Sequence, residues 1–189
     1  MREKILMVAA TQMNKRGIKF TVDHVAVDAG ISKKTIYRHF ASKNVLITQV
    51  IEMALVDVEK QEREILADQS RSFAEKITDL MLLEPKEFGK TEDWVLEDIK
   101  RHCNKDWERI EQFKYERMLV MKEFLEEGIA LGIVQSVNTQ VAARVLLGAA
   151  RELSQYDFLR ENHLDSIQAR QLLVEIFLHG ILTEKTDCK

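Results

Sequence analysis

The sequence predicts an all-α fold, and three observations carry that prediction. Only one proline and seven glycines occur among the 189 residues, so little interrupts helix formation. Residues with high helix propensity are abundant, and apolar residues recur at helical spacing through most of the chain. The hydrophobic content of 46% and the charged content of 31% are typical of a globular domain with its own core.

Three short helices are predicted in the first part of the chain. Residues 2–16 place Ile5, Ala9 and Met13 on one stripe, and Gly17 follows as a left-handed helix end. A second helix extends from an N-cap at Thr21 to Asp28, with Val22, Val25 and Ala26 facing inward. Ser32 is the N-cap of a third helix, which spans about residues 33–40 and ends at Ala41-Ser42.

Longer helices are predicted beyond this point. A long helix begins near Lys43 and extends to about Leu66, and the segment 84–93, with the only proline, is the clearest loop. The remaining helices are expected after an N-cap at Ser70 or Ser72, at 92–103, at 105–131, at 139–160 with Asn138 or Thr139 as the cap, and at 165–183 with Asp165 as the cap.

The charges of the chain are unevenly distributed. Residues 1–47 contain nine Lys and Arg against three acids, a net charge of +6, whereas residues 48–189 contain 19 basic and 28 acidic residues, a net charge of −9. A basic head on an acidic body suggests an anionic partner for the head alone. We therefore expect a domain boundary near residue 47, with residues 48–189 forming a second domain.

The turn Ala29-Gly30-Ile31 joins two short helices in the pattern of a helix-turn-helix. Ala26, Ile31, Ile36 and Phe40 are expected to form its small core. The polar residues of the third helix then face outward. In a helix-turn-helix, this second helix of the motif lies in the DNA major groove. A solvated charged face is the alternative interpretation of this basic run. The expected DNA-contacting residues are Thr21, Lys33, Lys34, Thr35, Tyr37, Arg38, His39 and Lys43.

Residues 5–51 closely resemble the DNA-binding domain of the tetracycline-repressor (TetR) family of bacterial transcription regulators. The resemblance rests on Ile5, Leu6, Ala9, Ala10 and Gly17, on "TV..VA..AGIS" at 21–32, and on "KKTIYRHFASK" at 33–43. The chain departs from the family pattern at Phe20, at Asp23, where a basic or polar residue often approaches the DNA backbone, and at Lys34, where glycine is frequent. These departures bear on which operator is bound.

The resemblance implies an all-helical homodimer of about nine helices per subunit, with the last two helices forming a four-helix bundle across the two-fold axis. It also implies a small ligand that binds the C-terminal domain and releases a palindromic DNA operator. Two other hypotheses stay open on the sequence: a small-molecule-binding helical bundle, and a non-specific DNA-binding protein.

The apolar residues of the last helices suit a dimer interface, with core packing as the alternative. The expected interface residues are Val145, Gly148, Ala149, Leu173, Ile176, Phe177 and Gly180. Aromatic residues and methionines of the middle helices are candidates for an apolar or weakly polar ligand site, although each is individually commoner in cores. The candidate ligand-binding residues are Met81, Trp94, His102, Trp107, Phe113, Met118 and Met121.

No catalytic triad, phosphate-binding loop, zinc motif or dinucleotide fingerprint occurs, so neither an enzyme nor a cofactor is expected. His102 and Asp106 are spaced as an i,i+4 pair that suits a metal, but no third ligand accompanies them, and no metal is expected. No apolar run approaches the roughly 20 residues that span a bilayer. Cys103 and Cys188 are read as reduced thiols of a cytoplasmic protein.

Overall fold

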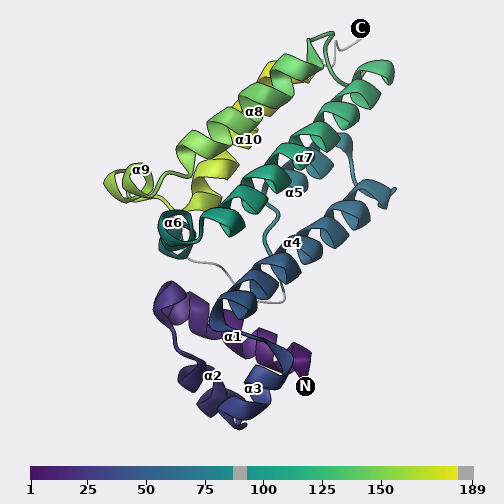
Figure 1. Ribbon diagram of the computed structural model, residues 1–189. Helices are drawn as coiled ribbons and strands as arrows, with labels where there is room; N and C mark the ends of the chain where they lie inside the picture. The colour runs from purple at the N-terminus through teal and green to yellow at the C-terminus, as the bar shows by residue number, and fades with distance from the viewer. Residues whose placement is uncertain (87–92, 183–189) are drawn as a thin grey trace, which may run out of the picture. The chain divides into compact units, whose positions relative to one another are not determined.

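The computed structural model describes residues 1–86 and 93–182, and the regular structure in these ranges is helical apart from one isolated bridge between Val134 and Leu182 (Figure 1). The helices are α1 (Arg2–Arg16), η1 (a 3₁₀ helix, Gly17–Lys19), α2 (Val22–Ala29), α3 (Lys33–His39), α4 (Lys43–Ala67), α5 (Phe73–Met81), α6 (Asp93–His102), α7 (Asn104–Ala130), α8 (Thr139–Leu153), α9 (Tyr156–Glu161) and α10 (Ser166–Ile181).

The N-caps follow the prediction from the sequence. Where the sequence left two candidates, Ser72 caps α5 and Asn138 caps α8, each accepting a hydrogen bond from the backbone of the first turn. Thr21, Ser32 and Asp165 cap α2, α3 and α10 in the same way. Small polar side chains placed just before an apolar periodic run are therefore reliable start signals in this chain.

Two predicted features are corrected. The single helix expected at 139–160 is interrupted after Leu153, where the Ser154 hydroxyl donates to the Ala150 carbonyl and α9 begins at Tyr156. A serine that bonds back to the preceding turn competes with helix continuation. At the end of α1, Gly17 has a φ of 60° but a ψ of −156°, outside the left-handed helical region, and the chain continues into η1.

The chain divides into two compact units, and the first contains Met1–Glu62 together with Glu84–Ile110. Its core includes Ile5 and Leu6 of α1, Phe20 and Phe40, all at most 1% exposed. Val95 and Ile99 of α6 are also buried, at 0% and 2% exposed, and α6 packs against η1. Phe20, which precedes the Thr21 cap, is a core residue that the sequence pattern did not single out.

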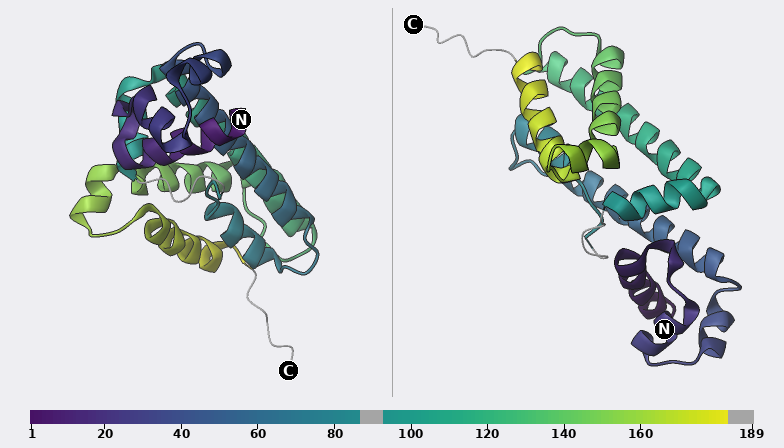
Figure 2. Two further views of the ribbon diagram at one scale, coloured as in Figure 1. Left: turned by 90° about the horizontal axis from the view of Figure 1, so that it is seen from below. Right: turned by 90° about the vertical axis from the view of Figure 1, so that its left-hand side faces the viewer.

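The second unit contains Arg63–Leu83 and the chain from Glu111 onward. Its core is built from α5, α7, α8 and α10, with α8 and α10 side by side (Figure 2). Phe73 and Phe124 stack with ring centroids 4.2 Å apart. A Cβ at Gly128 would overlap the Phe73 ring and lie 2.7 Å from Val134, so a larger residue there would displace these side chains.

Candidate nucleic-acid interface

The turn between α2 and α3 fixes the angle between the two helices. Gly30 adopts the left-handed conformation, with φ 66° and ψ 37°, which glycine reaches without steric cost. Its N–H donates to the Val27 carbonyl, and the N–H of Ile31 donates to the Ala26 carbonyl at 3.0 Å. These bonds end α2 and direct the chain into α3, as a helix-turn-helix requires.

One face of α3 is buried and the opposite face is exposed. Ile36 within α3 and Phe40 just beyond it are each 1% exposed and anchor the helix to the core of the first unit. Ile31, which the sequence also placed in this core, is half-buried. The outward side chains of α3 itself include no acid and have the composition of a phosphate-binding surface. The exposed residues of α3 are Lys33, Lys34, Tyr37, Arg38 and His39.

The two predicted threonines occupy helix starts. The Thr35 hydroxyl lies 3.0 Å from the Ser32 hydroxyl, and Thr35 is half-buried. Thr21 is exposed, and its side-chain oxygen accepts from the N–H of His24. His24 returns a bond through Nδ1, which accepts from the N–H of Thr21 at 3.2 Å, so a neutral His24 carries its ring proton on Nε2. This reciprocal cap fixes the start of α2, and sequence reasoning missed the contribution of His24.

Asp23 and Lys33 form an ion pair between α2 and α3. The Asp23 Oδ1 and the Lys33 Nζ are 2.6 Å apart, and the two side chains are 60% and 52% exposed. The sequence marked Asp23 as a departure from the family pattern, but it did not identify a partner. Lys34 and Arg38, by contrast, show no ion pair within the described part of the chain. The basic residues of this surface are therefore not equally available to an anion.

Lys43 at the start of α4 has a role inside the protein. Its Nζ donates to the carbonyl of Ile18 at 2.5 Å and lies 5.0 Å from the centre of the Phe20 ring. The side chain of Lys43 is half-buried. A lysine that only contacted a phosphate would need no such burial. Lys43 thus joins the first turn of α4 to η1, whatever it also contributes to DNA binding.

This geometry gives Lys43→Ala two expected effects. The free energy of unfolding should fall by about 1 kcal/mol, because a half-buried hydrogen bond from a charged group and a cation–π contact are lost. The salt dependence of DNA binding should fall by about one unit of slope, uniformly over sequences. Urea unfolding and binding at several salt concentrations measure the two effects. Lys34→Ala is the control, because that exposed lysine should leave unfolding unchanged.

Helix α6 contacts the backbone of η1 through Asp98. Asp98 Oδ2 accepts from the N–H of Ile18 at 2.8 Å. Asp98 therefore binds the backbone N–H of Ile18, and Lys43 binds its backbone carbonyl. Gly17 faces Asp98 and Trp94 without space for a Cβ. A second link joins α4 to α7, where the Thr48 hydroxyl donates to Asp106 at 2.7 Å. Sequence reasoning missed Asp98, because nothing in the local pattern of α6 distinguishes it.

The candidate ligand-binding residues are divided between the two units. Trp94, His102 and Trp107 belong to the first unit, where Trp94 packs near Gly17 and the Lys100 ammonium lies 5.8 Å from the Trp107 ring. In the second unit Phe113, Met118 and Met121 are buried, between 3% and 6% exposed, and Met81 packs against the core. Phe113, Met118, Met121 and Met81 therefore serve as packing residues, whereas His102 is exposed.

The metal pair considered from the sequence does not form. Because α6 ends at His102 and α7 begins at Asn104, His102 and Asp106 do not share a helix. His102 Nε2 instead lies 3.7 Å from Asp98, and Asp106 accepts from Thr48. In the described residues, no group of three His, Cys, Asp or Glu side chains is placed to hold a metal ion.

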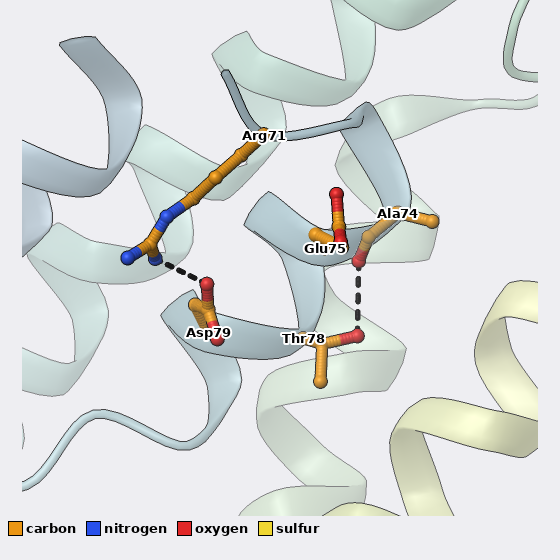
Figure 3. A pocket seen from close by; sticks show the side chains of 5 residues that line it. All are labelled: Arg71, Ala74, Glu75, Thr78 and Asp79. Carbon is orange, nitrogen blue, oxygen red and sulfur yellow. Dashed lines mark hydrogen bonds and ion pairs between the residues drawn. The ribbon is translucent and has the colours of Figure 1, made fainter. Parts of the chain in front are cut away.

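A pocket of about 320 Å³ lies on the second unit and contains none of the predicted ligand-binding residues. Arg71, Ala74, Glu75, Thr78 and Asp79 line it (Figure 3). Arg71 bonds to Asp79 across the pocket, and the Thr78 hydroxyl donates to the Ala74 carbonyl. Hydrogen bonds from Ser72 lower the pKa of the Glu75 carboxyl. The polar groups of this pocket therefore already have hydrogen-bond partners, either within the pocket or in the neighbouring residues Asp68 and Ser72.

Cys103 lies between α6 and α7 and is half-buried. Burial raises the pKa of its thiol, and the nearby carboxylates of Asp106 and Asp98 raise it further. Since the thiolate is the reactive form, Cys103 should react with iodoacetamide more slowly than free cysteine at pH 8, and its rate should increase only at higher pH. Mass spectrometry of a Cys188→Ser variant measures this rate. Reaction at the rate of free cysteine would contradict the prediction.

The predicted dimer residues lie on both faces of α8 and α10. Val145 is 58% exposed and Ile176 is 72% exposed, and Gly148 and Gly180 are also exposed. Ala149 and Phe177 are half-buried against the core of the second unit, and Leu173, at 9% exposed, is part of that core. Val141 and Leu172, 56% and 50% exposed, extend the exposed apolar face.

Comparisons with known proteins agree with this geometry. Residues 5–50 match the family described as bacterial regulatory proteins, tetR family. The chain is similar to YvaF of Bacillus subtilis (strain 168), an uncharacterized HTH-type transcriptional regulator, with 20% identity over 98% of this chain and 97% of that protein. It is also similar to the HTH-type transcriptional repressor KstR2 of Mycolicibacterium smegmatis, with 29% identity over 69% of this chain and 66% of that protein.

Solved structures show the same fold. A transcriptional regulator from Saccharomonospora viridis, crystallised in complex with choline, superposes with a TM-score of 0.77 at 17% identity, covering 97% of this chain and 98% of that one. No helix in the described ranges has the length and apolar character needed to cross a membrane. The matched proteins are regulators of transcription and not enzymes, as the sequence led us to expect. The helix-turn-helix and the match over residues 5–50 together identify the N-terminal domain as that of the TetR family of bacterial transcriptional regulators, and the chain as a whole shares the all-helical fold of such regulators.

Proposed function

We propose that this regulator is a cytoplasmic repressor that binds a palindromic operator as a homodimer and releases it when a small molecule binds. The observation that carries the proposal is the exposed basic face of α3, which is anchored from beneath by Ile36 and Phe40. One recognition helix per chain reads one half-site. A two-fold dimer therefore reads two half-sites, roughly 34–36 Å apart or somewhat more where the groove is widened.

The exposed apolar face of α8 and α10 supports the homodimer. Val145 and Ile176 are more than half exposed, and the positions around Gly148 and Gly180 leave open space beside the helix backbone. Large apolar side chains grouped on two adjacent helices are costly in water and indicate an interaction surface. Small residues between them allow a second copy of the helix pair to approach closely, as in a four-helix bundle.

An Ile176→Glu variant tests the dimer and the operator together. It should sediment as a monomer and protect both half-sites of the operator more weakly in a footprint, because the glutamate places a charge in the interface. Leu131→Glu is the matched control, since Leu131 is also exposed, at 63%, but lies outside the α8–α10 face. A wild-type monomer that protects one asymmetric half-site would contradict the proposed dimer.

Release by a ligand is supported by the contact between α6 and η1. Asp98 bonds to the backbone of Ile18, so a displacement of α6 would reach the segment that leads into α2. A ligand shifts DNA affinity only through its different affinity for two conformations. The choline complex of the Saccharomonospora protein supports a small organic effector in general. For this chain we propose an apolar or weakly polar molecule, and the candidate residues of each unit are to be tested as separate sets.

Tryptophan fluorescence provides the test of ligand control. Trp94 packs near Gly17 and Trp107 lies beneath Lys100, so a change in α6 should alter the emission of both. Candidate compounds are titrated while emission and operator release are followed in parallel. A compound that changes the emission but leaves operator affinity unchanged would show that its site is not the switch. Asp98→Ala should retain ligand binding and weaken the release.

A further inference from the structure

The ion pair between Asp23 and Lys33 is expected to contribute little to folding, so its role is expected in DNA binding. Both side chains are more than half exposed, and such pairs contribute about 0–1 kcal/mol to stability. The pair also joins the second residue of α2 to the first residue of α3, the two helices of the helix-turn-helix. Its position is therefore more informative about binding than about folding.

The pair changes the charge that the head presents to DNA. An acid close to the duplex repels phosphates, and a lysine held 2.6 Å from a carboxylate is less available to neutralise one. Neither penalty depends on base sequence. In an otherwise basic head, Asp23 therefore lowers affinity for every duplex, unless a particular sequence compensates it.

The major groove offers such compensation at a G·C base pair. Guanine presents two acceptors, O6 and N7, which suit a lysine ammonium, and cytosine presents an amino donor at N4, which suits a carboxylate. A neighbouring carboxylate and ammonium can exchange their mutual contact for these two contacts. A phosphate can take only the ammonium, and it leaves the carboxylate without a partner.

We propose that the Asp23–Lys33 ion pair is a specificity-determining element, which weakens binding to DNA of arbitrary sequence and is compensated where the operator presents a G·C pair to it. The inference rests on the proposed function, since it requires DNA binding through α3. Under this proposal Asp23 helps to select the operator, in addition to repelling DNA phosphates through its charge.

Asp23→Asn tests the proposal because it removes the charge and keeps the shape. Affinity for a duplex of arbitrary sequence should rise on the order of five- to tenfold at about 0.1 M salt, and the salt slope should steepen by about one unit, because Lys33 becomes available to a phosphate. Affinity for the operator should rise less or fall, so the ratio of the two affinities decreases. Glu3→Gln is the matched control, because it removes an exposed acid from α1 of the same head, outside the helix-turn-helix.

Lys33→Ala in both backgrounds separates a paired effect from a change in net charge. If Lys33 is the group released, Asp23→Asn should gain much less arbitrary-sequence affinity in the Lys33→Ala background. Equal gains from Asp23→Asn and Glu3→Gln would overturn the proposal, as would an unchanged affinity ratio. Selection from a random DNA library with the wild type tests the underlying function separately. If no sequence is enriched, operator binding itself fails; if the wild type and Asp23→Asn enrich the same sequences equally, only this inference fails.

Discussion

We expect Gly17→Ala to lower the free energy of unfolding of the first unit by about 2–6 kcal/mol, from two costs of about 1–3 kcal/mol each. The first cost is conformational, because Gly17 has a φ of 60° and a ψ of −156°, a region that residues with a Cβ rarely adopt. The second is steric, because the new methyl group would overlap the Asp98 carboxylate and the Trp94 ring. The overlap also disturbs the bond from Ile18 to Asp98.

Urea unfolding followed by tryptophan fluorescence measures this effect. Gly132→Ala is the matched control: Gly132 also has a positive φ, 71°, but no atom lies near its missing Cβ. This control should show the conformational cost alone, about 1–2 kcal/mol. Similar losses in the two variants would mean that the contact between η1 and α6 leaves room for a methyl group at position 17.

The second large effect is expected at the DNA surface. The double variant Lys34→Ala/Arg38→Ala should bind the operator about a hundredfold more weakly at about 0.1 M salt, because two cations that lack an ion pair within the described chain are removed. Base readout by Lys34 adds about 1–3 kcal/mol of discrimination at one position, so the loss should be greater for the operator than for arbitrary duplexes.

Affinity measured at several salt concentrations for the operator and for one unrelated duplex tests this prediction. The salt slope should become shallower by about two units. Lys15→Ala/Arg16→Ala at the end of α1 is a control with the same change in charge, in residues that the helix-turn-helix does not include. Equal losses in the two double variants would indicate binding through general positive charge and would favour a non-specific DNA-binding protein.

Local signals made most of the helices predictable. Periodic apolar residues and small polar caps gave the start of α2, α3, α8 and α10 within a residue, because a helix start depends on a few neighbouring side chains. The break after Leu153 was missed because no glycine or proline marks it. It depends instead on a serine hydroxyl that bonds to its own helix.

The DNA surface was predictable in composition but not in its internal contacts. The sequence identified the outward residues of α3, since the inward ones follow from Ile36 and Phe40. It did not predict that Lys33 bonds to Asp23 or that Lys43 bonds to Ile18. The Asp98 contact was still less predictable, because the two partners lie 80 residues apart and neither has an unusual neighbourhood in sequence. Tertiary packing determines such pairs, and the local pattern contains no signal for them.

The segment around Ile18 bears on whether the N-terminal helices can be transplanted. The carbonyl of Ile18 accepts a hydrogen bond from Lys43, and the N–H of Ile18 donates to Asp98. Asp98 belongs to α6, which follows much later in the chain. A fragment that ends within α4 would lack that acceptor and would expose the surfaces that Val95 and Ile99 cover. The helix-turn-helix of this protein is therefore not an interchangeable cassette. Chimeras that graft it onto another regulator should include α6, or they should carry over its contacts with η1.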